Sequence, residues 1–371
     1  MTTTLEQGQK EQSPRRPSPV GNDKPVEILD ERWTQVCAAS GATVWAGLAV
    51  LARMGIARIG AIELLFLFAP LVIVPLGMEL GRVIGGDGRL GKIARLSQPV
   101  GAGCAVVGIV MAPGFRAGLV VLGWMLVCVL MAGEGIVHLA SSWSRDVGRT
   151  LLDDGPARVR ATLVSATLAM ARIDLAVGGA WLVASRLGMR PMGIQEPIGL
   201  LTAVHFHYAG FATATIAAAT LRFAESRGHV GWPRRLVLIV VVLPFVVAAG
   251  FVISPALKML AATAFSICVA ALAVWLWACA RRLEDGMVRV LLQVASGAVF
   301  TGMALAGAYA VADLSGSEVL PIPQMARTHG LLNSMGFCLP GLLGWLVESS
   351  GRACMVFPGT ELEESEASEF R

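Results

Sequence analysis

Ten apolar runs of membrane-spanning length follow one another along the chain, with short linkers between them. In lipid, every backbone polar group must be satisfied within the spanning segment, and a helix needs about 20 mostly apolar residues to cross the hydrocarbon core. The linkers leave no room for a second domain, so we predict an all-α, polytopic transmembrane bundle of about ten helices. These are expected over 33–52, 60–80, 97–114, 117–140, 162–186, 198–221, 234–256, 258–281, 289–311 and 326–347.

The composition argues against a soluble domain and makes the lipid bilayer the first partner of this chain. Hydrophobic residues fill 55% of the 371 positions and charged residues only 15%, whereas a soluble domain carries roughly 25% charged residues. The seven cysteines are scattered singly, most of them inside apolar runs, where a cysteine acts as a small hydrophobic side chain. The basic residues follow the membrane topology, so no nucleic-acid partner is expected.

Lysine and arginine are distributed unequally between the two sides that ten helices define. With the N-terminus inside, the inner segments hold 22 of the 30 basic residues and the outer loops hold 7. Because basic segments stay in the cytoplasm, we predict that both termini are cytoplasmic. Residues 1–32 are polar and are expected to form a disordered tail. A short acidic tail is expected over 348–371, after a transmembrane domain over 33–347.

Two histidines, His205 and His207, stand inside the apolar run 198–221. Ionisable side chains at membrane depth are costly and therefore point to function. Residues two apart on a helix point about 200° away from each other, so the two rings are not expected to bind one ion together. Thr202 and Tyr208 share the face of His205, while the face of His207 carries small residues suited to close helix packing.

The last predicted helix adds His329 and Asn333, which share a face because they are four residues apart. The predicted topology places both in the outer half of the membrane, and His205 roughly 10 Å below the outer surface at 1.5 Å per residue. Glu63 falls in the first turn of the second predicted helix. We therefore predict an outer-half polar site, with His329 and Asn333 on one side and His205 or His207 on the other.

The fifth predicted helix carries Arg172 and Asp174 near the middle of the membrane, beneath this site. Because they are two residues apart, each is expected to find its partner on another helix. Together with Glu63, Thr202, Tyr208 and Asn333, they are candidates for supporting or relay roles around the three histidines.

Three roles are open to the histidines. Histidine is the commonest metal ligand and changes its charge near neutral pH, which suits ligation of a transition metal or haem, or a relay in a transporter or proton-coupled permease. The third role is interhelical hydrogen bonding, at about 0.6 kcal/mol for each bond. Ligand binding is the first expectation and transport the alternative. An enzyme is less favoured, and no catalytic residue is predicted, because the chain lacks GxxxxGK[ST], HExxH and GxSxG strings.

The short string HFHY also occurs in subunit I of haem-copper oxidases, but those proteins need more intramembrane histidines than this chain has. A longer combination resembles the YndJ-like family of bacterial integral membrane proteins. It consists of Glu63 with PLGMEL, GGAWLVASRLGMRPMG, LTAVHFHYAGF and RTHGLLNSMGF, within roughly 35–347. The resemblance implies a multi-pass architecture in the bacterial cytoplasmic membrane. It implies no particular reaction, cofactor or protein partner.

Overall fold

The computed structural model describes residues 24–147, 156–228, 231–317 and 320–356. Over these residues the chain is helical and contains no strand, which confirms the all-α class. Residues 1–23 and 357–371, which hold most of the two predicted tails, lie outside the described part. Helix α1 begins at Lys24, inside the segment predicted as a tail, and the last helix continues to Val356.

Ten rods of helix are present in the described residues, and three of them consist of several segments joined end to end. The single helices are α1 (Lys24–Arg53), α4 (Arg89–Val110), α5 (Phe115–Val147), α6 (Pro156–Leu187), α9 (Trp232–Ile253), α10 (Pro255–Ala280) and α11 (Gly286–Leu314). The first composite rod is α2 (Ala61–Phe68), η1 (Ala69–Ile73) and α3 (Val74–Gly85). The second is α7 (Ile198–His205), η3 (Phe206–Ala212) and α8 (Thr213–Ser226). The third is α12 (Ile322–Met325), η4 (Ala326–Gly330), η5 (Leu332–Cys338) and α13 (Leu339–Val356). A short 3-10 turn, η2 (Pro191–Gly193), precedes α7.

Nine of these rods are long and apolar enough to cross a membrane, counted over the described residues. Each overlaps a predicted span, and the largest shift is in the third, which covers Arg89–Val110 instead of 97–114. It begins earlier because Arg95 is buried in an ion pair and so remains within the helix. The remaining rod, 198–226, is not among these nine candidate spans. Its second half, α8, is nevertheless buried in the bundle over almost all of its residues.

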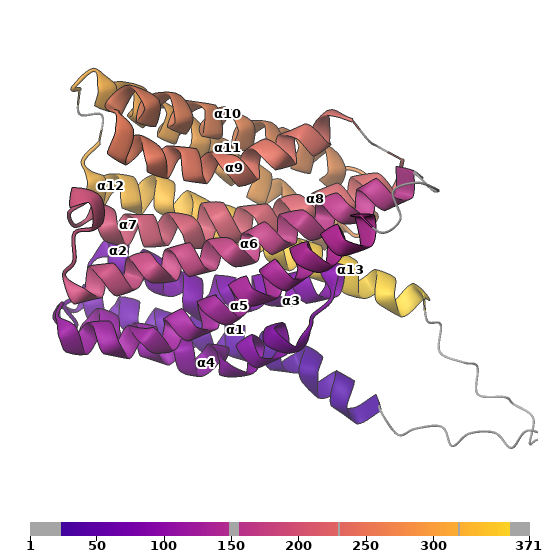
Figure 1. Cartoon of the computed structure of the whole chain (residues 1–371), viewed down its shortest axis with the longest axis horizontal. Helices are drawn as coiled ribbons and strands as arrows, with labels where there is room; N and C mark the ends of the chain where they lie inside the picture. Colours follow the sequence, from indigo (N-terminus) through magenta and orange to yellow (C-terminus); the bar gives the residue numbers. More distant parts are fainter. Residues whose placement is uncertain (1–23, 148–155, 229–230, 318–319, 357–371) are drawn as a thin grey trace, which may run out of the picture.

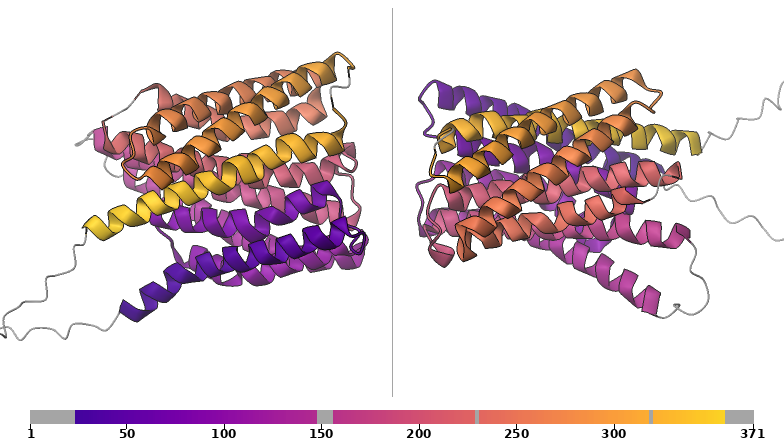
Figure 2. Two further views of the ribbon diagram at one scale, coloured as in Figure 1. Left: turned by 180° about the vertical axis from the view of Figure 1, so that it is seen from behind. Right: turned by 90° about the horizontal axis from the view of Figure 1, so that it is seen from above.

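The rods lie roughly side by side in one bundle, which Figures 1 and 2 show from three directions. Helices α4, α5 and α6 pack together, as do α9, α10 and α11, and the composite rod from α7 to α8 contacts α6, α9 and α13 between them. The start of α1 and the end of α13 leave from the same end of the bundle, here called the termini end (Figure 1). The prediction that this end faces the cytoplasm rests on its basic residues.

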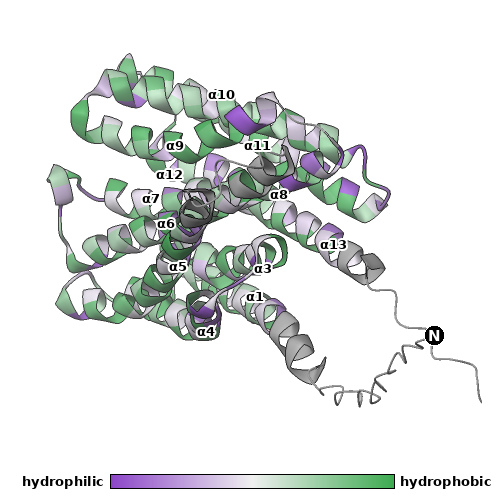
Figure 3. Cartoon of the chain, turned by 45° about the vertical axis from the view of Figure 1, so that its right-hand side comes forward, coloured by the Kyte–Doolittle hydropathy of each residue, from purple (hydrophilic) through white to green (hydrophobic). Residues whose placement is uncertain are grey.

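Apolar side chains cover much of the outside of the bundle, as the green ribbons of Figure 3 show. Large exposed hydrophobic residues follow the outer faces of α4, α5, α9 and α10, and include Leu96, Val100, Leu126, Val242 and Ile267. A surface of this kind is stable in contact with lipid acyl chains. The bundle is therefore a multi-pass membrane protein.

The three composite rods contain π-helical segments, in which the backbone bonds skip five residues instead of four. Segments η1, η3 and η5 contact one another in the interior of the bundle. Widened turns of this kind are rare in proteins overall, and those that occur often lie at functional sites. The junction of η1, η3 and η5 is therefore a candidate region for a functional site.

Side chains from neighbouring helices compensate the backbone groups that the widened turns leave open. Pro70 in η1 has no N–H to donate, and the hydroxyl of Tyr208 donates instead to the carbonyl of Leu65 at 2.8 Å. The amide of Gln98 in α4 donates to the Pro70 carbonyl at 2.6 Å. These bonds fix η1 against its neighbours, because an open carbonyl in an apolar interior is costly.

Gly41 allows a close approach between α1 and η1. A Cβ at this position would lie 1.9 Å from the backbone oxygen of Leu71 in η1. We expect Gly41→Ala to lower the free energy of unfolding by about 1–3 kcal/mol, since the helix has to move away.

Gly47 is the matched control on α1, because a Cβ there meets nothing within 4 Å. Gly47→Ala is expected to be neutral or stabilising by up to about 1 kcal/mol. Unfolding by SDS in mixed micelles measures both, and equal effects would contradict the close approach.

Candidate functional site in the bundle core

Asp174 lies near the middle of α6 and is completely buried, with 0% of its surface exposed. Neither carboxyl oxygen has a hydrogen-bond partner among the described residues. The carboxyl lies against the widened turn of η3, where a Cβ on Gly210 would come within 2.7 Å of the Asp174 Cβ. Glycine at position 210 therefore makes room for this carboxyl.

His207 is also fully buried, on the side of η3 that packs against α6 and meets Trp124 of α5. The indole N–H of Trp124 donates to its Nε2 at 3.0 Å, so Nδ1 carries the proton and donates to the Ala203 carbonyl at 2.8 Å. Phe66 meets the ring edge-on. Both ring nitrogens are thus occupied by protein groups, and the ring is held as a neutral imidazole.

His205 points away from His207, as a spacing of two residues requires, and is exposed. Its Nδ1 donates to the Leu201 carbonyl at 2.7 Å. The remaining nitrogen, Nε2, is then an acceptor and has no partner among the described residues.

His329 and Asn333 form one hydrogen-bonded unit on η4 and η5. The His329 Nδ1 donates to the Gly302 carbonyl of α11 at 2.9 Å. The Asn333 amide nitrogen donates to the His329 carbonyl at 2.7 Å and lies 3.2 Å from Nε2 of the ring. Gly302 allows this approach, because a Cβ there would lie 3.1 Å from the Asn333 amide nitrogen.

The structure places the other predicted site residues apart from this unit. The Thr202 hydroxyl donates to the Ile198 carbonyl of its own helix, and Tyr208 supports η1. Glu63 is half-buried in the first turn of α2 with its carboxylate over Gly60, where a negative charge is favoured by the helix dipole. Within the described part of the chain, none of the three forms a hydrogen bond to a histidine ring, so their roles here are local.

Arg172 belongs to a buried ionic cluster at the termini end of the bundle. Asp87, in the turn between α3 and α4, lies 2.6 Å from the Arg95 Nε and 3.6 Å from an Arg172 nitrogen. Arg172 also donates to the Gly86 carbonyl at 3.0 Å. Burial raises the pKa of the Asp87 carboxyl, although Arg95 and Arg172 act in the opposite direction. The carboxylate therefore depends on its two guanidinium partners.

Glu134 of α5 completes this end of the bundle. Its carboxylate accepts the backbone N–H groups of Gly88 at 2.5 Å and Gly91 at 3.2 Å, and His138 lies 2.9 Å from it. The glycine-rich turn after α3 is thus clamped by a carboxylate on one side and by Arg172 on the other. It acts as a structural turn, which agrees with the absence of a preceding strand.

Several residues of this arrangement are outside the set predicted from the sequence, among them Trp124, Asp87 and Gln98. Trp124 lies in the middle of a span, where its indole N–H needs an acceptor. Its position in the sequence therefore indicates that an acceptor lies on a neighbouring helix. Asp87 is an acid between two glycines, followed by several basic residues. Gln98 is a lone amide at membrane depth. In each case the residue type signals a need for a partner, but the partner itself comes from a distant part of the chain.

The arrangement suits proton exchange better than metal ligation. No group of three His, Cys, Asp or Glu side chains within the described ranges is placed to hold a metal ion. Of the three predicted histidines, only His207 has both ring nitrogens occupied by protein groups. The Asn333 amide nitrogen lies over the His329 ring, 3.1 Å from Nδ1 and 3.2 Å from Nε2, so it does not block Nε2. His205 and His329 thus offer one open nitrogen each, which is fewer than the three protein ligands usual for a catalytic zinc ion. A buried carboxyl without partners is, in contrast, a group that is stable when neutral and costly when ionised.

Comparisons with known proteins agree with this picture of a membrane protein. The family model described as "YndJ-like protein" matches residues 64–337. An uncharacterized membrane protein, YndJ of Bacillus subtilis (strain 168), is 28% identical over 181 residues, which are 48% of this chain and 32% of that protein. The match thus spans about a third of the relative's length. No solved structure matches.

Proposed function

This chain belongs to the YndJ-like family of membrane proteins, and we propose that it is a proton-coupled transporter in which Asp174 binds and releases the proton. The observation that carries the proposal is the carboxyl of Asp174, fully buried at mid-membrane with both oxygens unpartnered. An ionised carboxylate in such a place costs several kcal/mol. The resting group is therefore neutral, and its ionisation requires a change in the surrounding helices.

Polar groups at three depths support a relay through the bundle. The cluster of Asp87, Arg172 and Glu134 lies at the termini end, Asp174 lies near the middle, and His205 with His329 lies toward the opposite end. Intramembrane polar residues that follow one another in depth are typical of proton and substrate pathways. Because α6 carries both Arg172 and Asp174, a movement of this helix affects two of the three levels.

The π-helical segments supply the structural change that such a cycle needs. Asp174 faces η3, and η3 contacts both η1 and η5. Broken or irregular helices at membrane depth occur in transporters where they line a binding site. A shift of η3 between its widened turn and a regular α-turn would move Gly210 relative to Asp174 and open the carboxyl to protons.

Metal or haem binding, the first expectation from the sequence, has less support. Nε2 of His207 accepts from Trp124, so ligation by His207 requires this bond to be broken. His205 and His329 provide one open ring nitrogen each. Two ligands are fewer than the three protein ligands usual for a catalytic zinc ion.

A pH jump on wild-type proteoliposomes is expected to displace charge across the membrane as Asp174 binds or releases its proton. Solid-supported membrane electrophysiology measures this transient without knowledge of the substrate. Empty liposomes give the baseline. No transient above that baseline, over the full pH range, would remove the proposal.

His205→Ala is expected to slow this transient by on the order of tenfold, because its open Nε2 can accept a proton and pass it on. The total displaced charge should remain, since Asp174 is unchanged. Thr202→Ala is the matched control one turn away, because its hydroxyl bonds only within its own helix. Equal rates in the two variants would show that His205 is not part of the relay.

A further inference from the structure

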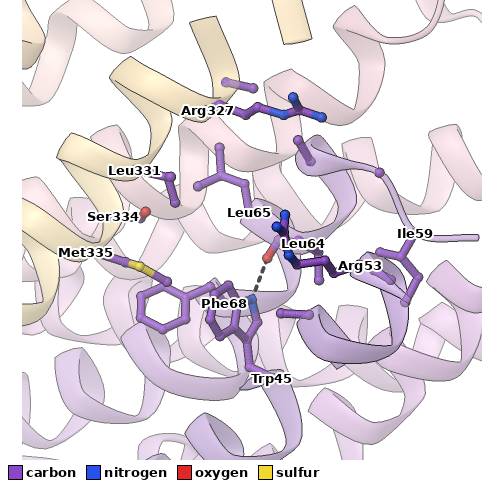
Figure 4. Close-up of a pocket in the computed structure, with 15 residues that line it drawn as sticks. Trp45, Arg53, Ile59, Leu64, Leu65, Phe68, Arg327, Leu331, Ser334 and Met335 are labelled. Carbon is purple, nitrogen blue, oxygen red and sulfur yellow. Dashed lines mark hydrogen bonds between the residues drawn. The ribbon is translucent and has the colours of Figure 1, made fainter. Parts of the chain in front are cut away.

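A cavity lies outside the core site, at the end of the bundle opposite the termini. It has a volume of about 510 Å³ and is bounded by α1, α2 and the η4–η5 segment, as Figure 4 shows. Its body is apolar and is formed by Trp45, Leu64, Phe68 and Met335. The volume falls within the range of small-molecule sites, roughly 300–1,000 Å³.

Two arginines stand at the mouth of this cavity. Arg53 ends α1 and Arg327 belongs to η4, and both are exposed. Neither guanidinium has a hydrogen bond or ion pair with another described residue, and the lining contains no carboxylate. The Glu63 carboxylate lies over the lining residue Gly60 but forms no ion pair with either arginine. The mouth therefore carries two unpaired cations, at an end of the bundle that is otherwise poor in basic residues.

The cavity is a groove that runs into the membrane. Trp45 lies eight residues before Arg53 on α1, and Met335 eight after Arg327, so the apolar body extends about 12 Å beyond the arginines at 1.5 Å per residue. Helix α1 and the last rod lie on either side of the α2–α3 rod (Figure 2, left). Leu331 belongs to the wall of the groove and is 43% exposed. This wall therefore reaches the outer surface of the bundle, where lipid acyl chains lie.

We propose that this groove binds an anionic lipid of the surrounding bilayer, with its headgroup between Arg53 and Arg327 and one acyl chain along Trp45, Phe68 and Met335. The two arginines select the negative headgroup, and the apolar body accommodates the chain. A soluble anion would leave the apolar walls unused, and an uncharged lipid would leave both guanidinium groups without a counterion. The site is separate from Asp174 and independent of the proposed transport function.

Brominated lipids test this site, because bromine on an acyl chain quenches a tryptophan that it contacts. The full chain is placed in phosphatidylcholine nanodiscs with a rising fraction of brominated phosphatidylglycerol or brominated phosphatidylcholine. The chain has nine tryptophans, so the signal of Trp45 is the difference between wild type and Trp45→Phe. An arginine beside an anionic headgroup is worth about a factor of five in affinity. With two arginines at the mouth, phosphatidylglycerol is therefore expected to half-quench Trp45 at a roughly 25-fold lower fraction.

Three variants complete the experiment. Arg53→Gln with Arg327→Gln should abolish the preference, whereas Arg190→Gln, an exposed arginine after α6, should retain it. Ala49→Phe, which fills the groove from α1, should remove the quenching of Trp45 by both lipids. Equal quenching by the two lipids in wild type, or a preference that survives in the double arginine variant, would overturn the proposal. A failed pH-jump experiment has no bearing on either result.

Discussion

Asp87→Ala is expected to lower the free energy of unfolding by about 3–5 kcal/mol, the usual cost of removing one partner from a buried ion cluster. Asp87 is the shared counterion of Arg95 and Arg172, whose side chains are only 2% and 3% exposed. Without it, two guanidinium groups remain buried with reduced compensation. The turn between α3 and α4 also loses the side chain that joins it to α6.

Asp313→Ala is the matched control for this variant. Asp313 makes an ion pair of the same length, 2.6 Å, with Lys258, but its side chain is 37% exposed. Solvent screens this pair, so its loss is expected to cost less than about 1 kcal/mol. SDS unfolding of both variants in mixed micelles gives the comparison. Similar losses would mean that the Asp87 cluster is hydrated and contributes no more than a surface pair.

Asp174→Asn is expected to abolish the charge displacement of the pH jump while leaving the fold intact. The amide has nearly the shape of the protonated carboxyl but carries no exchangeable charge at any pH. Because the carboxyl makes no hydrogen bond to a described residue, the substitution breaks no bond. The free energy of unfolding should change by less than about 1 kcal/mol, in contrast with the Asp87 variant.

Glu63→Gln provides the control, since it makes the same chemical change at a half-buried carboxyl in the first turn of α2. It should retain the displacement. Two results would contradict the role of Asp174: a full transient in Asp174→Asn, or a large loss of stability in that variant. The second result would indicate that the carboxylate is ionised and paired in the folded protein.

Much of the fold could be predicted from the sequence. Helix number and class follow from apolar length, because lipid forces each span to satisfy its own backbone bonds. The different faces of His205 and His207 follow from helical geometry, and so does the pairing of His329 with Asn333 four residues later. The widened turns could not be predicted, although Pro70 and Gly210 both lie in them.

The candidate site could be predicted only in part. The sequence indicated that Arg172 and Asp174 would each find a partner outside their own helix. Arg172 does so, because it contacts Asp87 and Gly86 in the turn between α3 and α4. It gave no sign that Asp174 would remain without a partner, or that Trp124 would occupy the Nε2 of His207. These outcomes depend on which helices are neighbours and on their rotation.

By itself, then, the sequence determined a multi-pass helical membrane protein with costly polar groups at known positions along its spans. Only the tertiary structure decided which of those groups meet. The physical reason is that lipid tails are as apolar as leucine, so burial alone does not specify which helix faces which. Close approaches at Gly41 and Gly210, together with the ion cluster around Asp87, set the packing. That packing leaves Asp174 alone at the centre of the bundle.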